Sequence, residues 1–263
     1  MPLNVLVLAA GIADPKWPLS KLEIANDGAT VRDALPRILS PFDEAALEIA
    51  LKLRDADPAT RVAVALFDVS DSDALARSVG ALRPDALRRI DARAVALWDA
   101  AGSASFFRDL LSADPTLDLV LIGREFGDLD DGVLPPCIAE KLGWRFAALI
   151  QQVSAMEGRL ELMRERGRVR ESFEIVPPMI ASVTNDRKNR LRHPLLKNLM
   201  LAKRSTFPLE KLQTTHNDLQ LTLRAAIPAP TKMRATACRL LDGPVEGQAA
   251  QLSDYLRAAR AAK

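Results

Sequence analysis

The sequence contains few of the residues from which metal sites and disulfide frameworks are built. Among 263 residues there are two cysteines and two histidines. Cys137 and Cys238 form no CxxC pair and have no metal-ligand spacing with His193 and His216, so we expect neither a bound metal nor a disulfide framework. Low cysteine content suits a reducing compartment, and the predicted location is the cytoplasm.

Strong net charge and long apolar runs are also lacking. The chain has 36 Lys and Arg against 34 Asp and Glu, so overall charge does not argue for nucleic-acid binding. No run reaches the roughly 18 apolar residues of a membrane helix, and we expect no membrane insertion. The opening MPLNVLVLAAGIAD lacks the charged start of a signal peptide, which favours a buried first strand.

What the chain does contain is an alternation of apolar strands and amphipathic helices. Strands are expected at residues 3–9, 61–67, 88–92 and 117–122, and helices at residues 41–54, 72–82, 106–111 and 133–142. This order predicts an α/β fold with a parallel sheet and helices on both faces, similar to adenine-nucleotide α-hydrolases. Ligands of such sheets bind beyond the carboxyl ends of the strands, after Ala9, Phe67 and Gly123.

The pattern changes in the second half of the chain. Further strands are expected at residues 146–153, 159–164, 168–175 and 179–184, with Gly158 and Gly167 as turns, and they predict an antiparallel extension of the sheet. We divide the chain into a nucleotide-binding-like domain, 1–205, and a C-terminal arm, 206–263. A docking loop, 185–200, belongs to the first. The arm ends in a helix near 248–262 and is expected to pack on a partner subunit.

Residues 123–132, GREFGDLDDG, form the most informative stretch, because it leaves a buried strand and enters a helix. Amide groups at a helix start can bind an anion such as a nucleotide phosphate. An acidic loop that caps the helix is the plainer alternative, and spacing alone favours it. Beside a phosphate, the aspartates would have to bind ribose hydroxyls, cap the helix or hold a cation.

A basic run follows the last predicted strand. Its cations are Arg187, Lys188, Arg190, Arg192, Lys197, Lys203 and Arg204. No interleaved aromatic residues offer stacking for bases, so nucleic acid is disfavoured. A loop that steers an acidic protein partner fits better, with a solvated basic face as the alternative. Leu196 is either a hot spot of such a contact or the buried first residue of the next helix.

Four ordered motifs resemble the β subunit of electron-transfer flavoproteins. Residues 123–144 match its GRQ-x-I-D-x-D-x-G-Q and L-A-E-x-L-G-W pattern at Gly123, Arg124, Asp128, Asp130, Gly132, Pro136, Ala139, Glu140, Leu142, Gly143 and Trp144. Residues 40–48 resemble NPFDE-x-A-L-E, and residues 176–184 resemble a segment containing L-P-A-V-V-T. Residues 189–204 resemble N-E-P-R-Y-P-S-L-P-x-I-M-K-A-K-K. The resemblance covers about residues 3–205.

The resemblance implies an electron carrier rather than an enzyme. Such a β subunit pairs with an α subunit that holds most of the redox-active FAD, and the complex passes electrons from a flavin-dependent dehydrogenase towards a membrane quinone reductase. The β subunit itself buries a second nucleotide, AMP in the common group or FAD in the electron-bifurcating group. An adenine-nucleotide-binding α/β enzyme and a degenerate structural homologue are the alternatives.

The resemblance also implies site residues. The nucleotide would contact Leu8, Ala9, Ser40, Pro41, Phe42, Asp43, Phe67, Asp128, Asp130, Asp131, Gly132, Val133, Leu134, Pro135 and Pro136. Phe42 would also approach the FAD of the α subunit. The residues expected to contact the dehydrogenase are Arg192, His193, Leu196 and Met200. No catalytic and no metal-binding residue is expected.

Because of three departures from the family pattern, the resemblance does not determine which nucleotide the site holds, or whether it holds one. Ala10 stands where the family has a basic residue, Val133 where it has glutamine, and Phe67-Asp68-Val69 replaces S-x-G-P. Asp68 brings a negative charge towards a phosphate, which is unfavourable unless the carboxylate is turned away or countered by a cation. The site is therefore expected to hold AMP or to be empty, reshaped or differently filled.

Overall fold

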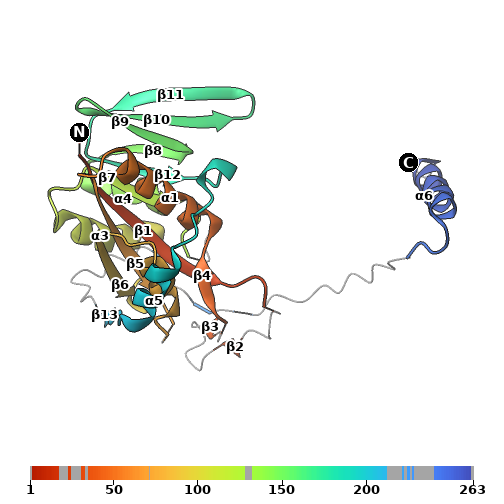
Figure 1. Ribbon diagram of the computed structural model, residues 1–263, viewed down its shortest axis with the longest axis horizontal. Helices are drawn as coiled ribbons and strands as arrows, with labels where there is room; N and C mark the ends of the chain where they lie inside the picture. The colour runs from red at the N-terminus through yellow and green to blue at the C-terminus, as the bar shows by residue number, and fades with distance from the viewer. Residues whose placement is uncertain are drawn as a thin grey trace. The chain divides into compact units, whose positions relative to one another are not determined.

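The apolar run near the N-terminus forms β1 (Asn4–Ala13), the middle strand of the main sheet (Figure 1). The computed structural model describes residues 2–17, 23–24, 31–32, 35–70, 72–127, 132–211, 221, 224–225, 227 and 240–261. The chain divides into two units, residues 1–226 and 227–263. Each unit is described by itself.

The main sheet has the strand order β13-β6-β5-β1-β7-β12-β8, with β4 paired to β1. These strands are β4 (Arg37–Leu39), β5 (Arg61–Asp68), β6 (Ala86–Asp91), β7 (Leu119–Gly123), β8 (Arg145–Ile150), β12 (Met179–Val183) and β13 (Leu209–Glu210). All pairs on this path are parallel, and only β4 runs antiparallel to its neighbour. The predicted parallel α/β fold is confirmed.

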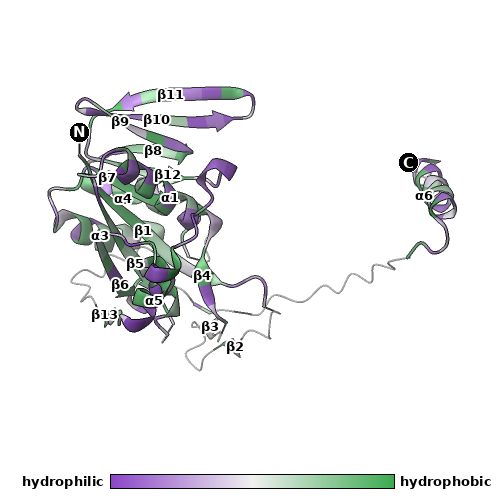
Figure 2. Ribbon diagram, viewed as in Figure 1, coloured by the Kyte–Doolittle hydropathy of each residue, from purple (hydrophilic) through white to green (hydrophobic). Residues whose placement is uncertain are grey.

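Helices cover both faces of this sheet because successive side chains of β1 point to opposite sides. Val5 and Val7 belong to the core beneath α1, and Leu8 and Ala10 belong to the core beneath α3 and α4. The helices are α1 (Pro41–Ala56), α2 (Ala74–Gly80), α3 (Ala100–Ser112), α4 (Leu134–Leu142) and α5 (Leu196–Arg204), with short 3-10 turns η1 (Ala92–Ala94) and η2 (Arg187–Asn189). Figure 2 shows the hydrophobic residues concentrated in the central strands.

Helix α1 begins as the sequence predicts. The Ser40 hydroxyl accepts a 3.0 Å hydrogen bond from the Asp43 N–H, and Pro41 occupies the first turn. Asp43 and Glu44 lie near the positive end of the helix dipole. These local signals fix where α1 starts, and α1 in turn places its first turn at the candidate site.

The antiparallel strands form a sheet of their own instead of lengthening the main one. It contains β9 (Gln152–Met156), β10 (Arg159–Arg166) and β11 (Val169–Ile175), in the order β11-β10-β9. The single strand expected at residues 146–153 is in fact β8 and β9. Leu149, whose φ is 61°, lies at an irregularity within β8; Ile150 still pairs with Val183 in the main sheet, and Gln152 already pairs with Met163 in the second sheet. The strand expected at residues 179–184 is β12, a parallel strand between β7 and β8.

A short strand pair and the C-terminal helix complete the described chain. A short antiparallel pair joins β2 (Glu23–Ile24) to β3 (Val31–Arg32). The predicted C-terminal helix is confirmed as α6 (Val245–Ala261), which belongs to the second unit and has no buried residue. β13 pairs with β6, so residues beyond 205 contribute to the main sheet, and the division at 205 stays a prediction. Among the described residues, no helix is both long and apolar enough to cross a membrane.

Candidate functional site

The carboxyl ends of β1, β5 and β7 form one edge of the main sheet. In the strand register, Leu8 lies opposite Ile122 and Ala10 opposite Phe67. Leu8, Ala9 and Phe67 are all buried. Ligands of parallel sheets bind at such an edge. The structure therefore brings these three predicted contact residues together in the expected place.

The first turn of α1 closes tightly against the end of β7. A Cβ atom on Gly123 would lie 2.9 Å from Asp43 Oδ1 and 3.0 Å from Phe42 Cβ. Any other residue at this position would have to displace the first turn of α1 and the backbone at Glu125, whose carbonyl oxygen would be 2.8 Å away, so the glycine is required for close approach. The predicted residues Ser40, Phe42 and Asp43 are buried at this contact, and Pro41 is exposed.

Asp43 is a buried acid at the same edge. Its Oδ2 accepts a 2.9 Å hydrogen bond from the Ser40 hydroxyl. Burial raises the pKa of Asp43 to about 8, although the hydrogen bond from Ser40 opposes that rise. The carboxyl group is therefore mostly protonated at neutral pH and contributes little negative charge to the edge.

The start of α4 lies against the same core. Leu134 and Pro135 are buried, and Leu134 packs in the cluster that contains Phe67. Val133 is 44% exposed, and Gly132 has a φ of 65°. The predicted aspartates lie outside the described residues: Asp128, Asp130 and Asp131.

Asp68 is neutralised by a cation that the sequence analysis missed. Its Oδ2 lies 2.9 Å from Arg89 Nε, and the side chains are 0% and 5% exposed. Asp68 Oδ1 accepts hydrogen bonds from the Ser70 N–H and hydroxyl, while Arg89 Nη2 donates to the carbonyls of Ser70 and Ser72. The loop after β5 is thus held to β6. The signal in the sequence was Asp68 at the end of the apolar strand β5, with Arg88 and Arg89 in the next strand, β6.

Phe67 fills the adjoining space with an aromatic cluster. Its ring centroid lies 6.1 Å from that of Phe106, 5.0 Å from Phe107 and 5.5 Å from Phe126, in tilted or edge-on arrangements. Such geometry is typical of packed aromatic cores. Phe67 is only 1% exposed. Where the resemblance implied small residues, the structure has packed side chains.

The described loop after β5 and the first turn of α4 offer few donors for the phosphate of an adenylate. A phosphate at this edge needs amide donors or cations. The Ser70 N–H already donates to Asp68, and the Arg89 guanidinium already bonds Asp68 and the Ser70 carbonyl. Pro135 and Pro136, in the first turn of α4, have no N–H to donate.

The side chains at the end of β7 would suit a flavin. The Arg124 guanidinium lies 4.9 Å from the centre of the Phe42 ring and pairs with Glu125 at 3.2 Å. Phe42 is 8% exposed, whereas the Arg124 side chain is 38% exposed. A cation stacked on an aromatic ring suits an electron-rich, planar group. At this edge Arg124, rather than Phe42, faces outward.

Arg192 turns inward, towards α1. Its guanidinium and backbone N–H bond both carboxylate oxygens of Glu48 at 3.0–3.1 Å, and its Nη1 lies 2.7 Å from Asp55. The hydrogen bonds to Glu48 raise the pKa of Arg192 above its usual value. The described contacts of this predicted docking residue are therefore within the chain.

The other docking residues lie at the surface of α5 and the turn before it. Leu196 is the first residue of α5 and is 75% exposed, so the alternative that it is buried is wrong. Leu195, Met200 and Leu201 are 71%, 48% and 41% exposed. We call Leu195, Leu196, Met200 and Leu201 the docking patch. His193, just before it, is also exposed.

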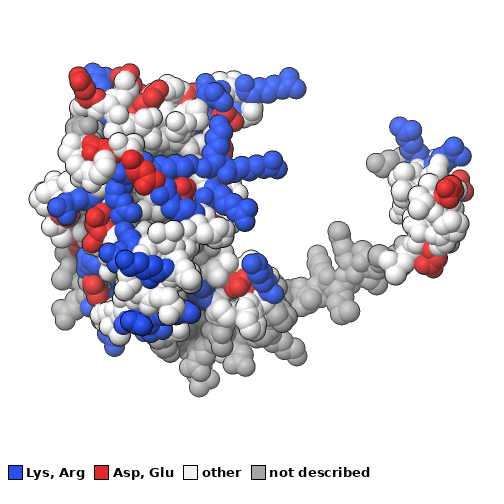
Figure 3. All heavy atoms as spheres, viewed as in Figure 1, with Lys and Arg blue, Asp and Glu red and all other residues white. Residues whose placement is uncertain are grey.

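Basic side chains lie on the same helix as the docking patch and in the segment before it. Lys197, Lys203 and Arg204 lie on α5, and Arg187 and Lys188 lie in η2. Figure 3 shows Lys and Arg gathered over the face of the first unit that carries α5 and the segment before it. An apolar patch within a positive surface suits a transient contact with an acidic protein.

The chain is similar in sequence to known electron transfer flavoproteins. A family model described as "Electron transfer flavoprotein domain" matches residues 28–200. The chain is 25% identical over 211 residues to electron transfer flavoprotein subunit beta of Megasphaera elsdenii, covering 78% of this chain and 77% of that one. It is 28% identical over 218 residues to the subunit beta of Mycobacterium leprae, covering 76% of each. It is 24% identical over 187 residues to caffeyl-CoA reductase-Etf complex subunit CarD of Acetobacterium woodii, covering 70% and 69%.

Proposed function

The chain belongs to the electron transfer flavoprotein family, and from this premise we propose that it is the β subunit of a heterodimeric carrier. In this role it pairs with an α subunit in the cytoplasm and passes electrons from a flavin-dependent dehydrogenase towards a membrane quinone reductase. The observation that carries the proposal is the docking patch: exposed Leu195, Leu196 and Met200 on a basic surface.

The docking patch suits rapid, reversible contact. A carrier must meet two partners in turn, which favours a small interface with fast dissociation. The exposed leucines supply apolar anchors, and Lys197, Lys203 and Arg204 attract an acidic surface during approach. The charges then set the rate of encounter, and the apolar anchors determine which partner stays bound.

The end of β7 is the proposed meeting place with the FAD of the α subunit. A bound FAD supplies the redox chemistry by accepting and releasing electrons. Arg124 would present a positive charge to it, and Phe42 would hold the Arg124 guanidinium in place by stacking. Buried, protonated Asp43 would keep negative charge away from the same edge.

The edge of the main sheet is proposed to be filled by the chain itself instead of by AMP. The Asp68–Arg89 pair and the cluster around Phe67 support this. The C-terminal arm is proposed to pack on the α subunit. In its last helix, Leu252, Tyr255 and Leu256 are 48%, 70% and 56% exposed, and these side chains would be covered there.

Co-expression with the α subunit tests the proposed function. A yellow heterodimer with one FAD, reduced by a flavin-dependent dehydrogenase and reoxidised by a quinone reductase, is the expected result. Turnover of ATP by the isolated chain, or stable isolation with a partner that binds no flavin, would contradict it and favour the nucleotide-binding enzyme or the structural homologue.

A further inference from the structure

Charged side chains along one stripe of α1 face the segment that leads to the docking patch. Glu48, Lys52 and Asp55 are spaced four and three residues apart, so they project from the same side of the helix. The segment consists of residues 186–194, contains η2 and leads to α5. We call it the docking segment. All three side chains of the stripe bond to it.

The strongest of these contacts joins Glu48 to Arg192. Glu48 Oε2 accepts from the backbone N–H of Arg192 at 3.1 Å and from Nε at 3.0 Å, and Oε1 accepts from Nη2 at 3.0 Å. The Glu48 side chain is only 7% exposed. Asp55 takes the remaining nitrogen, Nη1, at 2.7 Å. A bidentate ion pair of this kind fixes both the position and the orientation of the Arg192 guanidinium.

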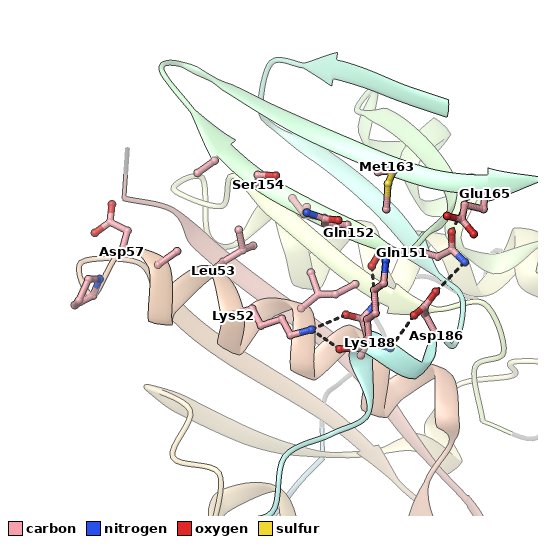
Figure 4. A pocket seen from close by; sticks show the side chains of 16 residues that line it. Lys52, Leu53, Asp57, Gln151, Gln152, Ser154, Met163, Glu165, Asp186 and Lys188 are labelled. Atoms are coloured by element: carbon pink, nitrogen blue, oxygen red, sulfur yellow. Dashed lines mark hydrogen bonds between the residues drawn. The ribbon is translucent and has the colours of Figure 1, made fainter. Parts of the chain in front are cut away.

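A second contact holds the beginning of the docking segment. The Lys52 ammonium donates to the Lys188 carbonyl and, at 3.0 Å, to Asn189 Oδ1. Asn189 is 4% exposed, and its amide donates to the Gln151 carbonyl at 2.6 Å. Gln151 in turn donates to Asp186 at 3.2 Å. Figure 4 shows Lys52 reaching from α1 to the segment, with Gln151 and Asp186 bonded beside it.

Apolar packing beneath the docking segment is incomplete. A hollow of about 430 Å³ lies between residues 190–194 on one side and α2 with β4 on the other. Leu191 is only partly buried against the core. Since few buried apolar contacts make a segment easy to displace, its position depends heavily on the polar contacts with α1.

We propose that Glu48 and Arg192 form a latch that holds the docking segment on α1 and so positions the docking patch for its partner. This inference rests on the proposed function. Arg192 is then a positioning residue that acts through Glu48, not a contact to the partner. Its Nε, Nη1 and Nη2 atoms are all used within the chain. A segment held in its binding position loses less conformational entropy when the partner docks.

The variant Glu48→Gln tests the latch in the full chain within its heterodimer. Removing the charge should raise the apparent KM for the partner dehydrogenase about tenfold, equivalent to roughly 1.4 kcal/mol, with kcat and FAD content unchanged. Glu140→Gln makes the same chemical change at an exposed residue of α4, a helix that packs on the opposite face of the sheet, and should leave the KM unchanged. An unchanged KM in Glu48→Gln would overturn the proposal.

A double-mutant cycle separates positioning from direct contact. If Arg192 acts through Glu48, the losses in Glu48→Gln and Arg192→Met are not additive, and the double variant is no worse than the worse single one. If Arg192 contacts the partner directly, the losses add, which would overturn the proposal. Thermal unfolding of each variant checks that the fold is retained.

Cleavage by trypsin tests the latch without any electron transfer. Trypsin cuts after basic residues, and the docking segment contains Arg187, Lys188 and Arg190. Faster cleavage there in Glu48→Gln than in Glu140→Gln is expected, with native cleavage elsewhere. Equal rates would overturn the latch. Since this comparison needs no partner, it still decides the question if the proposed carrier function itself fails.

Discussion

Asp68 on β5 and Arg89 on β6 lie 2.9 Å apart, and both side chains are almost completely buried. The pair joins neighbouring parallel strands and also ties down the loop that follows β5, through the carbonyls of Ser70 and Ser72. Arg89 is thus the cation that counters Asp68. The acidic departure from the family pattern is therefore compensated within the chain.

Replacing Arg89 with methionine should strongly destabilise the protein. Asp68 would be left buried without its cation, at a cost of about 3–5 kcal/mol. The free energy of unfolding in urea measures this. Arg88→Met is the matched control, because Arg88 pairs with Glu210 at the surface, where loss costs about 0–1 kcal/mol. Equal losses in the two variants would contradict a structural role for the buried pair.

Denaturing the purified heterodimer should release FAD but no stoichiometric adenylate. The reason is that Phe67 and the Asp68–Arg89 pair are packed where a phosphate would need donors. Chromatography of the protein-free supernatant, with AMP and FAD standards, measures both nucleotides. One AMP per heterodimer would show that the edge of the sheet opens or that a phosphate finds other donors.

Asp43 should make stability fall as pH rises. Its pKa is about 8 in the folded chain against an ordinary value of 3.8, so the folded state holds the proton more tightly. The resulting stabilisation is complete below the ordinary pKa and is lost as pH rises towards 8, by at most about 1.4 kcal/mol per pH unit. The variant Asp43→Asn lacks this carboxyl group, so its stability should not show this pH dependence.

Urea unfolding of wild type and Asp43→Asn from pH 5 to pH 9 checks this. The variant should gain stability relative to wild type up to about pH 8, and the difference should then level off. Glu140→Gln, an exposed carboxyl on α4, is the control. A difference between Asp43→Asn and wild type that is independent of pH would show that Asp43 is ionised throughout.

Leu196→Ala should weaken docking without weakening the fold. The side chain is 75% exposed, so it contributes little to stability, but an apolar anchor at an interface is typically worth about 1–2 kcal/mol or more. We expect kcat/KM with the dehydrogenase to fall about tenfold. Val169→Ala, on exposed β11, is the control. Equal activity of both variants would exclude Leu196 as an anchor.

The sequence predicted the fold well where the spacing of apolar residues and the helix-capping residues indicate the same element. Ser40 and Pro41 mark the start of α1, and the buried runs of β1, β5 and β7 are too apolar for anything but a sheet covered on both faces. The division between β8 and β9 was not predictable, because the chain passes from one sheet to the other between Ile150 and Gln152, and neither glycine nor proline marks the position.

The site was less predictable because its decisive contacts are remote in sequence. Arg89 meets Asp68 only once two strands pair side by side. Arg192 resembles its basic neighbours in sequence, yet its carboxylate partner Glu48 lies 144 residues earlier. The spacing of residues alone does not show whether Leu196 is exposed or buried, since the first residue of a helix can be either.

Helix α1 also fixes the distance between the end of β7 and the docking segment. Its first turn contacts the end of β7 through Asp43, and its later stripe reaches Asp55 beside the docking segment. At a rise of about 1.5 Å per residue, these two points are about 18 Å apart along the axis. Inserting one residue between them would rotate the stripe by about 100° and uncouple the two ends. The distance between the proposed flavin edge and the docking segment is therefore set by the number of residues in one helix.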